Sequence, residues 1–237
     1  MKKSKWLIFM AGVMLVFIGC LPMVNHYETA QTAGQGQFQI GGSMSPYYYW
    51  KSESSGSGSL FWPITRFDIK YGISNKLDIG AAFLFNFYIP GIALNAKYQF
   101  LKNNVDGAVL LDGSYSRYSY TLFGSSVTDK ILTLRPAIVV SREKTGQFPF
   151  SLALGLHYWH VASTISGVQT GTSITSVTAN LGLPIRLGSM RFMPEIGLWV
   201  PFMGSATVGH NNTEYFFKTG SVLIQVGAYL GYAGKKE

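Results

Sequence analysis

An alternation of apolar and polar residues with a period of two is the feature that most constrains how this chain folds. It is clear over residues 91–101, where every second side chain is apolar. The apolar set is Ile92, Leu94, Ala96, Tyr98 and Phe100, and the other set is Ala93, Asn95, Lys97 and Gln99. A helix would scatter each set around its circumference, whereas a β-strand places each set on one face. The pattern therefore predicts strands with one apolar face.

The same alternation recurs along the chain and predicts further strands. We expect strands over residues 36–49, 60–72, 76–88, 91–101, 107–120, 130–142, 147–160, 173–187, 190–203 and 219–232. Short connections such as Ser74-Asn75 and Gly188-Ser189 alternate with longer segments rich in Ser, Gly and Thr. Short turns at one end and long loops at the other are typical of an up-and-down barrel. The predicted fold is all-β, an antiparallel β-barrel of about ten strands, or about eight if the hairpin at 76–101 is misassigned.

Composition favours a transmembrane barrel over a soluble lipocalin-like barrel, which has the same alternation with its polarity reversed. Only 13% of the residues are charged, against about 25% in an ordinary soluble domain. The polar faces are rich in Gly and Ala, which suits a crowded interior, and aromatic residues gather near the strand ends. Aromatic belts mark the two interfaces of a membrane. Beyond the N-terminus no apolar run reaches the about 18 residues of a membrane helix. We therefore expect transmembrane β-strands in contact with outer-membrane lipids.

The N-terminus has the pattern of an export signal. Lysines precede an apolar run over residues 6–18, which suits a signal peptide and is short for a membrane span. The run ends in Phe17, Ile18, Gly19 and Cys20, which resembles the bacterial lipobox. This resemblance implies a lipoprotein in which Cys20 is lipidated and becomes the new N-terminus.

These features divide the chain into four parts. We expect a signal peptide over residues 1–19, a lipid-anchored linker over 20–35, the barrel over 36–232 and a C-terminal tail over 233–237. Both ends of the barrel would lie on the side of the short turns, which is periplasmic in outer-membrane barrels. The predicted location is the bacterial outer membrane, with the N- and C-termini in the periplasm.

Three segments resemble those of bacterial outer-membrane barrels. The end of the last predicted strand resembles the C-terminal signal that the barrel-assembly machinery reads, with its polar, glycine, hydrophobic and aromatic positions. The matching residues are Gln225, Gly227, Leu230 and Tyr232. Residues 66–80 resemble a hairpin common in these barrels, and residues 28–36 resemble the start of their lipoprotein-type members. The resemblance implies an outer-membrane barrel and the assembly machinery as a partner, and it implies no activity.

The alternation places a set of charged or titratable residues on the inward face. They are Arg66, Asp68, Lys70, Asp78, Lys97, Asp112, Arg135, His157, Arg186 and Glu195. They cannot face lipid, where Arg or Lys at the midplane costs about 2–4 kcal/mol. Our main interpretation is a ladder of ion pairs, because buried charges must be matched and small barrels are filled by their own side chains. The alternative is a cation-lined pathway for an anionic or amphipathic solute.

Candidate functions follow from the lumen and the loops. We expect a structural or surface-interaction role, with the lumen largely plugged by side chains and an extracellular ligand bound by the outer loops. A narrow channel or transporter for small or amphipathic solutes is the alternative, and a lipid-modifying enzyme is less favoured. His157 shares the inward face with Ser151, but the His-Ser and Asp-His pairs of the outer-membrane deacylase and protease families are missing. We therefore expect no catalytic residues and no enzymatic activity.

Neither a cofactor, a metal nor a nucleic acid is expected. Without the three lysines of the signal, 16 Lys and Arg residues face 11 Asp and Glu residues, and the basic residues form no cluster. His157, His160 and His210 have poor spacing for a metal site. The sequence also contains no phosphate-binding glycine loop.

Overall fold

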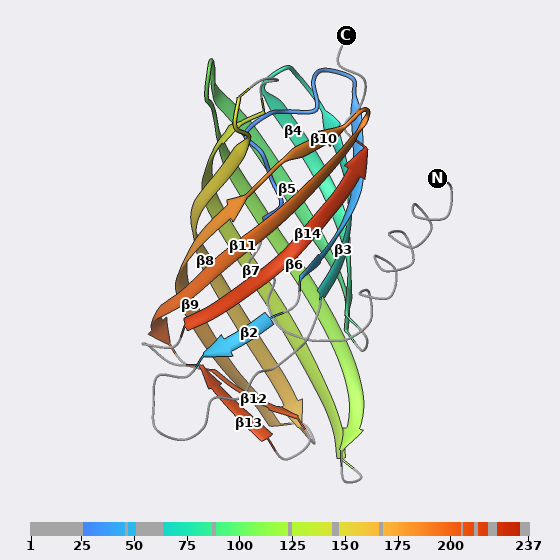
Figure 1. Cartoon of the computed structure of the whole chain (residues 1–237). Coiled ribbons are helices and arrows are strands. Elements are labelled where there is room, and N and C mark those ends of the chain that lie inside the picture. The colour runs from blue at the N-terminus through green and yellow to red at the C-terminus, as the bar shows by residue number, and fades with distance from the viewer. Residues whose placement is uncertain are drawn as a thin grey trace, which may run out of the picture.

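The computed structural model describes residues 26–45, 47–50, 64–86, 89–122, 125–143, 147–165, 168–204, 206–210, 213–217 and 222–232. Its strands are β1 (Phe38–Ser45), β2 (Tyr47–Trp50), β3 (Ile64–Gly72), β4 (Leu77–Asn86), β5 (Ile89–Lys102), β6 (Asp106–Leu122), β7 (Ser125–Arg142), β8 (Phe150–Ile165), β9 (Val168–Gly182), β10 (Ile185–Leu187), β11 (Met190–Gly204), β12 (Ala206–His210), β13 (Thr213–Phe217) and β14 (Val222–Tyr232). All except β12 and β13 belong to one antiparallel sheet that closes into a barrel (Figure 1). Among the described residues, no helix is long and apolar enough to cross a membrane.

Strand β14 closes the barrel. On one side it pairs with β11, from Met190 opposite Tyr232 to Trp199 opposite Leu223. On the other side it pairs first with β1 and then with β2, which continues past the end of β1. Strands β9 and β10 likewise share one position beside β11. The wall therefore has ten strand positions, and the prediction of a ten-stranded barrel is confirmed.

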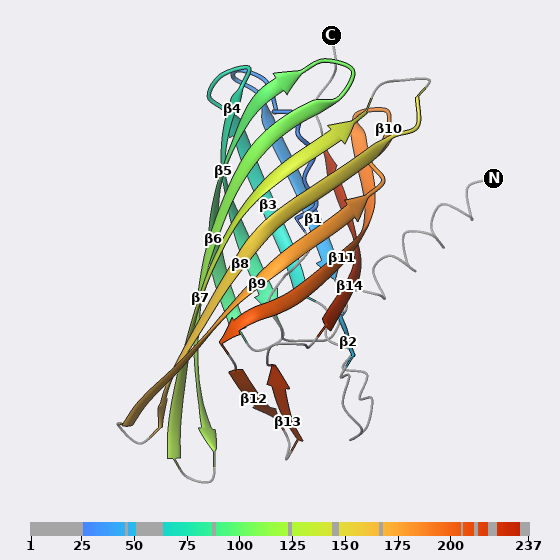
Figure 2. The same cartoon turned by 90° about the vertical axis from the view of Figure 1, so that its left-hand side faces the viewer.

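The two ends of the barrel differ. At one end, residues 73–76, 103–105 and 188–189 join neighbouring strands, and β14 ends there (Figure 1). We call this the short-turn end and the opposite one the loop end. At the loop end the β6–β7 and β8–β9 hairpins project far beyond the other strands, and the separate β12–β13 hairpin lies near them (Figure 2).

The predicted alternation gives the wall an apolar outer face and a polar inner face. On β5, the outward Ile92 and Leu94 are 60% and 68% exposed, whereas the inward Ala93 and Lys97 are 1% and 2% exposed. The other strands repeat this pattern, so most exposed large side chains are apolar. A surface of that kind suits contact with lipid rather than water. The inner face holds the charges.

Several predicted boundaries were wrong at the loop end. The Ser- and Thr-rich segments 121–129 and 161–172 were expected to be loops, but β6 to β9 extend through most of them. The backbone ladder forms whatever the side chains are, and the hydroxyls of Ser119 and Thr128 add a 2.8 Å hydrogen bond across the hairpin. At the other end, β9 stops at Gly182 because Pro184 has no N–H to donate, and β10 resumes the pairing.

Candidate lumenal site

Residues 26–35, here called the lumenal segment, run inside the barrel instead of along its wall. The segment starts near the middle of the barrel, passes to the short-turn end and turns there into β1 (Figure 1). Its first five residues are buried, and Thr29 and Ala30 have no exposed surface. At the short-turn end, Gly36 donates its N–H to the carbonyl of Gly72 over 2.8 Å. The interior of the barrel is thus occupied by the protein's own chain.

Side chains of the wall accept hydrogen bonds from the backbone N–H groups of the segment. The two carboxylate oxygens of Glu195 accept from His26 and Tyr27, at 2.8 and 2.9 Å. Further along, Ser141 accepts from Ala30 at 2.8 Å. These acceptors come from β11 and β7, which are far from the segment in sequence. Only the closed wall brings them together.

Other wall side chains donate to the carbonyl groups of the segment. The hydroxyl of Ser151 donates to the carbonyl of Glu28 at 2.6 Å. The ammonium of Lys97 donates to the carbonyls of Thr29 and Gln31, at 3.2 and 2.7 Å. The wall therefore supplies both acceptors for the N–H groups and donors for the carbonyl groups of the segment.

The carboxylate of Glu28 is the charged centre of the site. It forms ion pairs with Lys70 and, at 3.1 Å, with Lys97. Lys97 also lies 3.5 Å from Asp78, whose carboxylate accepts the N–H of Ala33 at 3.0 and 3.1 Å. All four charged side chains are at most 7% exposed. Each of these four buried charges therefore has a partner of opposite charge, which burial of an ion in a protein requires.

Two glycines of the wall make room for the segment. A Cβ at Gly72 would overlap the carbonyl oxygen of Gly34, and one at Gly227 would overlap the hydroxyl of Tyr27. That hydroxyl donates to the carbonyl of Met44 at 3.0 Å. Tyr27 itself has a φ of 50°, a left-handed conformation that is uncommon for an aromatic residue. The contacts to Glu195 and Met44 hold it there.

A second group of ion pairs lies deeper in the barrel, beyond the start of the segment. Arg66 is 2.7 Å from both Asp68 and Asp112, and Arg135 is 2.8 Å from Asp112. All four side chains are at most 7% exposed. Together with the pairs around Glu28, this group lines the lumen with paired charges.

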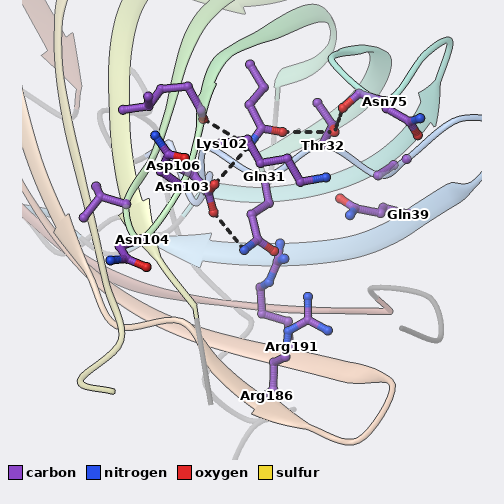
Figure 3. A pocket seen from close by; sticks show the side chains of 15 residues that line it. Gln31, Thr32, Gln39, Asn75, Lys102, Asn103, Asn104, Asp106, Arg186 and Arg191 are labelled. Atoms are coloured by element: carbon purple, nitrogen blue, oxygen red, sulfur yellow. Dashed lines mark hydrogen bonds between the residues drawn. The ribbon is translucent and has the colours of Figure 1, made fainter. Parts of the chain in front are cut away.

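A polar cavity of about 970 Å³ opens at the short-turn end, where the lumenal segment leaves the barrel. Figure 3 shows Gln31 and Thr32 of the segment facing side chains of the wall there. Gln31 donates to Asp106 at 3.0 Å and Thr32 to the carbonyl of Asn75 at 2.9 Å. The remaining labelled side chains include Gln39, Lys102, Asn103, Asn104, Arg186 and Arg191.

Glu143, which follows β7, holds the two arginines of this cavity. Its carboxylate lies 3.0 Å from Arg191 and 3.4 Å from Arg186. Burial by itself would raise the pKa of Glu143, but the charge of Arg191, a hydrogen bond with Thr29 and the charge of Arg186 together lower that pKa. Arg186 is the least buried of the predicted inward residues, with 27% of its side chain exposed, because it lies at the rim.

His157 lies fully buried, but its contacts do not form a catalytic arrangement with Ser151. The indole N–H of Trp199 donates to Nδ1 of His157 at 3.0 Å. Ser151 instead donates to the carbonyl of Glu28. His160 points elsewhere and contacts Ser173. Within the described ranges, no group of His, Cys, Asp and Glu residues could hold a metal.

The predicted assembly signal lies on β14. Gln225 is buried on the inner face, whereas Leu230 and Tyr232 are about half exposed on the outer face, near the short-turn end. Gly227 is the residue beside the hydroxyl of Tyr27. Cys20, the predicted signal peptide and the tail 233–237 lie outside the described residues.

Sequence reasoning missed the lumenal segment, which falls in the range expected to be a linker. It also did not single out Glu28, Ser141 or Glu143 as parts of a site. The segment lacks a period of two, so its pattern does not distinguish it from an exposed linker. One signal of a buried segment was available in the sequence. The inward positions of the predicted strands carry more basic than acidic residues, so an acidic residue from outside these strands is needed to balance their charge.

No protein-family model matches the chain, and no curated protein matches it. Among solved structures, the outer membrane protease OmpT from Escherichia coli aligns with 82% of this chain and 96% of its own, at 14% identity and a TM-score of 0.44. Ail, the attachment invasion locus protein of Yersinia pestis, aligns with 84% and 98%, at 11% identity and a TM-score of 0.38. Neisserial surface protein A aligns with 83% and 97%, at 10% identity and a TM-score of 0.40. The assignment as an outer-membrane type of β-barrel rests on the strand wall itself, and these similarities add no role.

Proposed function

We propose that the protein is a self-plugged barrel of the bacterial outer membrane with a structural or surface-interaction role. The observation that carries this proposal is the lumenal segment, bound by side chains of several strands and buried over its first five residues. The matched charges around Arg66 and Arg135 narrow the lumen beyond the start of the segment. The lumen then passes no solute at rest, and the protein acts through its outer surface.

The loop end supports an outward-directed role. The β6–β7 and β8–β9 hairpins extend beyond the rest of the wall and present strands on which hydroxyl side chains are frequent (Figure 2). An extracellular ligand or another surface molecule would meet these hairpins first. Lipidation of Cys20 would add a second membrane attachment to that of the barrel.

Conductance of the purified protein in planar lipid bilayers tests the plug. We expect wild-type protein to show no stable conductance steps, and a variant from which residues 26–33 are deleted to conduct. We call this variant the vacated barrel. As a matched control, deletion of residues Ala206–His210 (β12), which lie outside the barrel sheet, leaves the lumen untouched, and this variant should remain closed. Large, stable steps from wild-type protein would refute the proposal.

A narrow channel for anionic or amphipathic solutes is the second candidate. The cavity at the short-turn end favours it, because Arg186, Arg191 and Lys102 line an opening into the lumen. If wild-type protein conducts in small, anion-selective steps, this candidate replaces the first.

A further inference from the structure

We propose that the barrel lumen is a binding site for a short acidic peptide, and that the lumenal segment occupies this site in the resting protein. This inference rests on the proposed function, because it treats the plug as a bound ligand. It goes further by assigning the chemical class of ligand that the lumen takes from a separate chain.

The first argument is that the wall recognises the backbone of the segment. Glu195, Ser141 and Asp78 accept its N–H groups, and Ser151 and Lys97 donate to its carbonyls. These wall groups are buried, and unpaired buried polar groups are costly. Because every peptide carries the same backbone groups, this part of the recognition does not require the sequence of residues 26–35.

The second argument is that the side-chain contacts select one kind of peptide. Lys70 and Lys97 converge on the carboxylate of Glu28, so an acidic residue is required at that position. Thr29 and Ala30 are completely buried, and Ala30 packs among small and aliphatic side chains of the wall. Those neighbours are Ala108, Leu110, Ala137, Val139 and Ala153. The ligand is therefore a short peptide with an acidic residue followed by two small ones.

The third argument concerns competition with the tethered segment. The segment is joined to β1 through only a few residues, and short tethers give effective concentrations in the range of about mM. A separate peptide at lower concentration would not displace it from wild-type protein. Binding must therefore be measured after the segment has been removed or loosened.

The experiment uses a fluorescent synthetic peptide of residues 26–33 and the vacated barrel in detergent. We expect saturable binding, and closure of the bilayer conductance of the vacated barrel by the same peptide. A peptide with Gln in place of Glu28 should bind at least ten-fold more weakly, and one with Leu in place of Ala30 should not bind. Wild-type protein should bind none of them at micromolar concentration.

A second variant covers the case in which the vacated barrel fails to fold. In Gly72→Ala, the new methyl group overlaps the carbonyl oxygen of Gly34 in the tethered segment. The peptide of residues 26–33 lacks Gly34, so the same variant should still accept it. Gly113→Ala, where the nearest atoms to the new Cβ are 3.7 Å away, is the matched control and should bind no peptide.

The outcomes separate this inference from the proposed function. A wild-type barrel that conducts refutes the plug, whatever the peptide does. A vacated barrel that folds and conducts, but whose conductance the peptide leaves unchanged, refutes the peptide site alone. If free glutamate displaced the fluorescent peptide as well as the unlabelled peptide does, the site would be only an anion site at Lys70 and Lys97. That result would also overturn the inference.

Discussion

Glu28 illustrates how much one side chain contributes to holding the lumenal segment in the barrel. It is the only acidic residue between positions 26 and 35, and it pairs with Lys70 and Lys97. Glu28→Gln removes the buried ion pair with Lys70 and leaves Lys97 with Asp78 alone. Breaking a buried pair in this way costs about 3–5 kcal/mol. We expect the segment to leave the lumen more often, seen as conductance openings and a lower thermal unfolding midpoint. Glu28→Asp, which keeps the charge, should restore part of the closure, and unchanged traces for Glu28→Gln would contradict this account.

Gly72 tests the fit between the wall and the segment without altering any charge. Gly72→Ala introduces one methyl group where the carbonyl of Gly34 now lies, and the backbone contact between Gly36 and Gly72 resists adjustment. We expect more frequent openings in bilayer recordings than in wild-type protein, with the barrel still assembled. Gly113→Ala should behave as wild type, since its new Cβ makes only ordinary contacts. Indistinguishable recordings for the two variants would show that the segment does not depend on this contact.

At the scale of elements, the projecting β6–β7 hairpin and the lumenal site should be independent. The hairpin extends from the loop end, whereas the segment contacts the wall between the middle and the short-turn end (Figure 2). Replacing residues 120–127 by Asn-Gly joins the directly paired Ser119 and Thr128 through a two-residue turn that suits a hairpin. We expect unchanged heat-modifiable migration on gels and an unchanged closed lumen. Loss of assembly would mean that the hairpin contributes to the fold of the barrel.

At the scale of the whole molecule, the attachment of the N-terminus remains a prediction. The pattern Ile18-Gly19-Cys20 at the end of a short apolar run predicts that the chain begins at a diacylated Cys20. Intact-mass measurement of protein extracted from membranes should show that N-terminus with its acyl chains. Cys20→Ser should block processing while the barrel still folds. A processed N-terminus elsewhere, or an unacylated Cys20, would contradict the prediction.

The sequence by itself determined the wall of the barrel. In a strand the two faces alternate strictly, so the apolar set of β5 had to face outward and Lys97 inward once the outside was lipid. The same rule placed Arg66, Asp112 and Arg135 in the lumen, where buried charges have to be paired, and Asp112 pairs with both arginines. The number of strand positions in the wall followed because each long alternating segment occupies one position, even where it is split into two strands, as in β1 and β2. The sequence did not determine where the strands end, because backbone pairing continues through Ser- and Thr-rich residues whose composition is typical of loops.

Only the tertiary structure decided what fills the lumen. Glu195, Ser141 and Asp78 lie 168, 111 and 45 positions away from the residues whose N–H groups they accept. They meet the segment because closing the sheet places distant strands around one axis. The segment carries no pattern of its own, because its recognition uses backbone groups that every residue has. Contacts made by the backbone place almost no constraint on the sequence of the segment. Here the one residue whose type indicated the contact was Glu28.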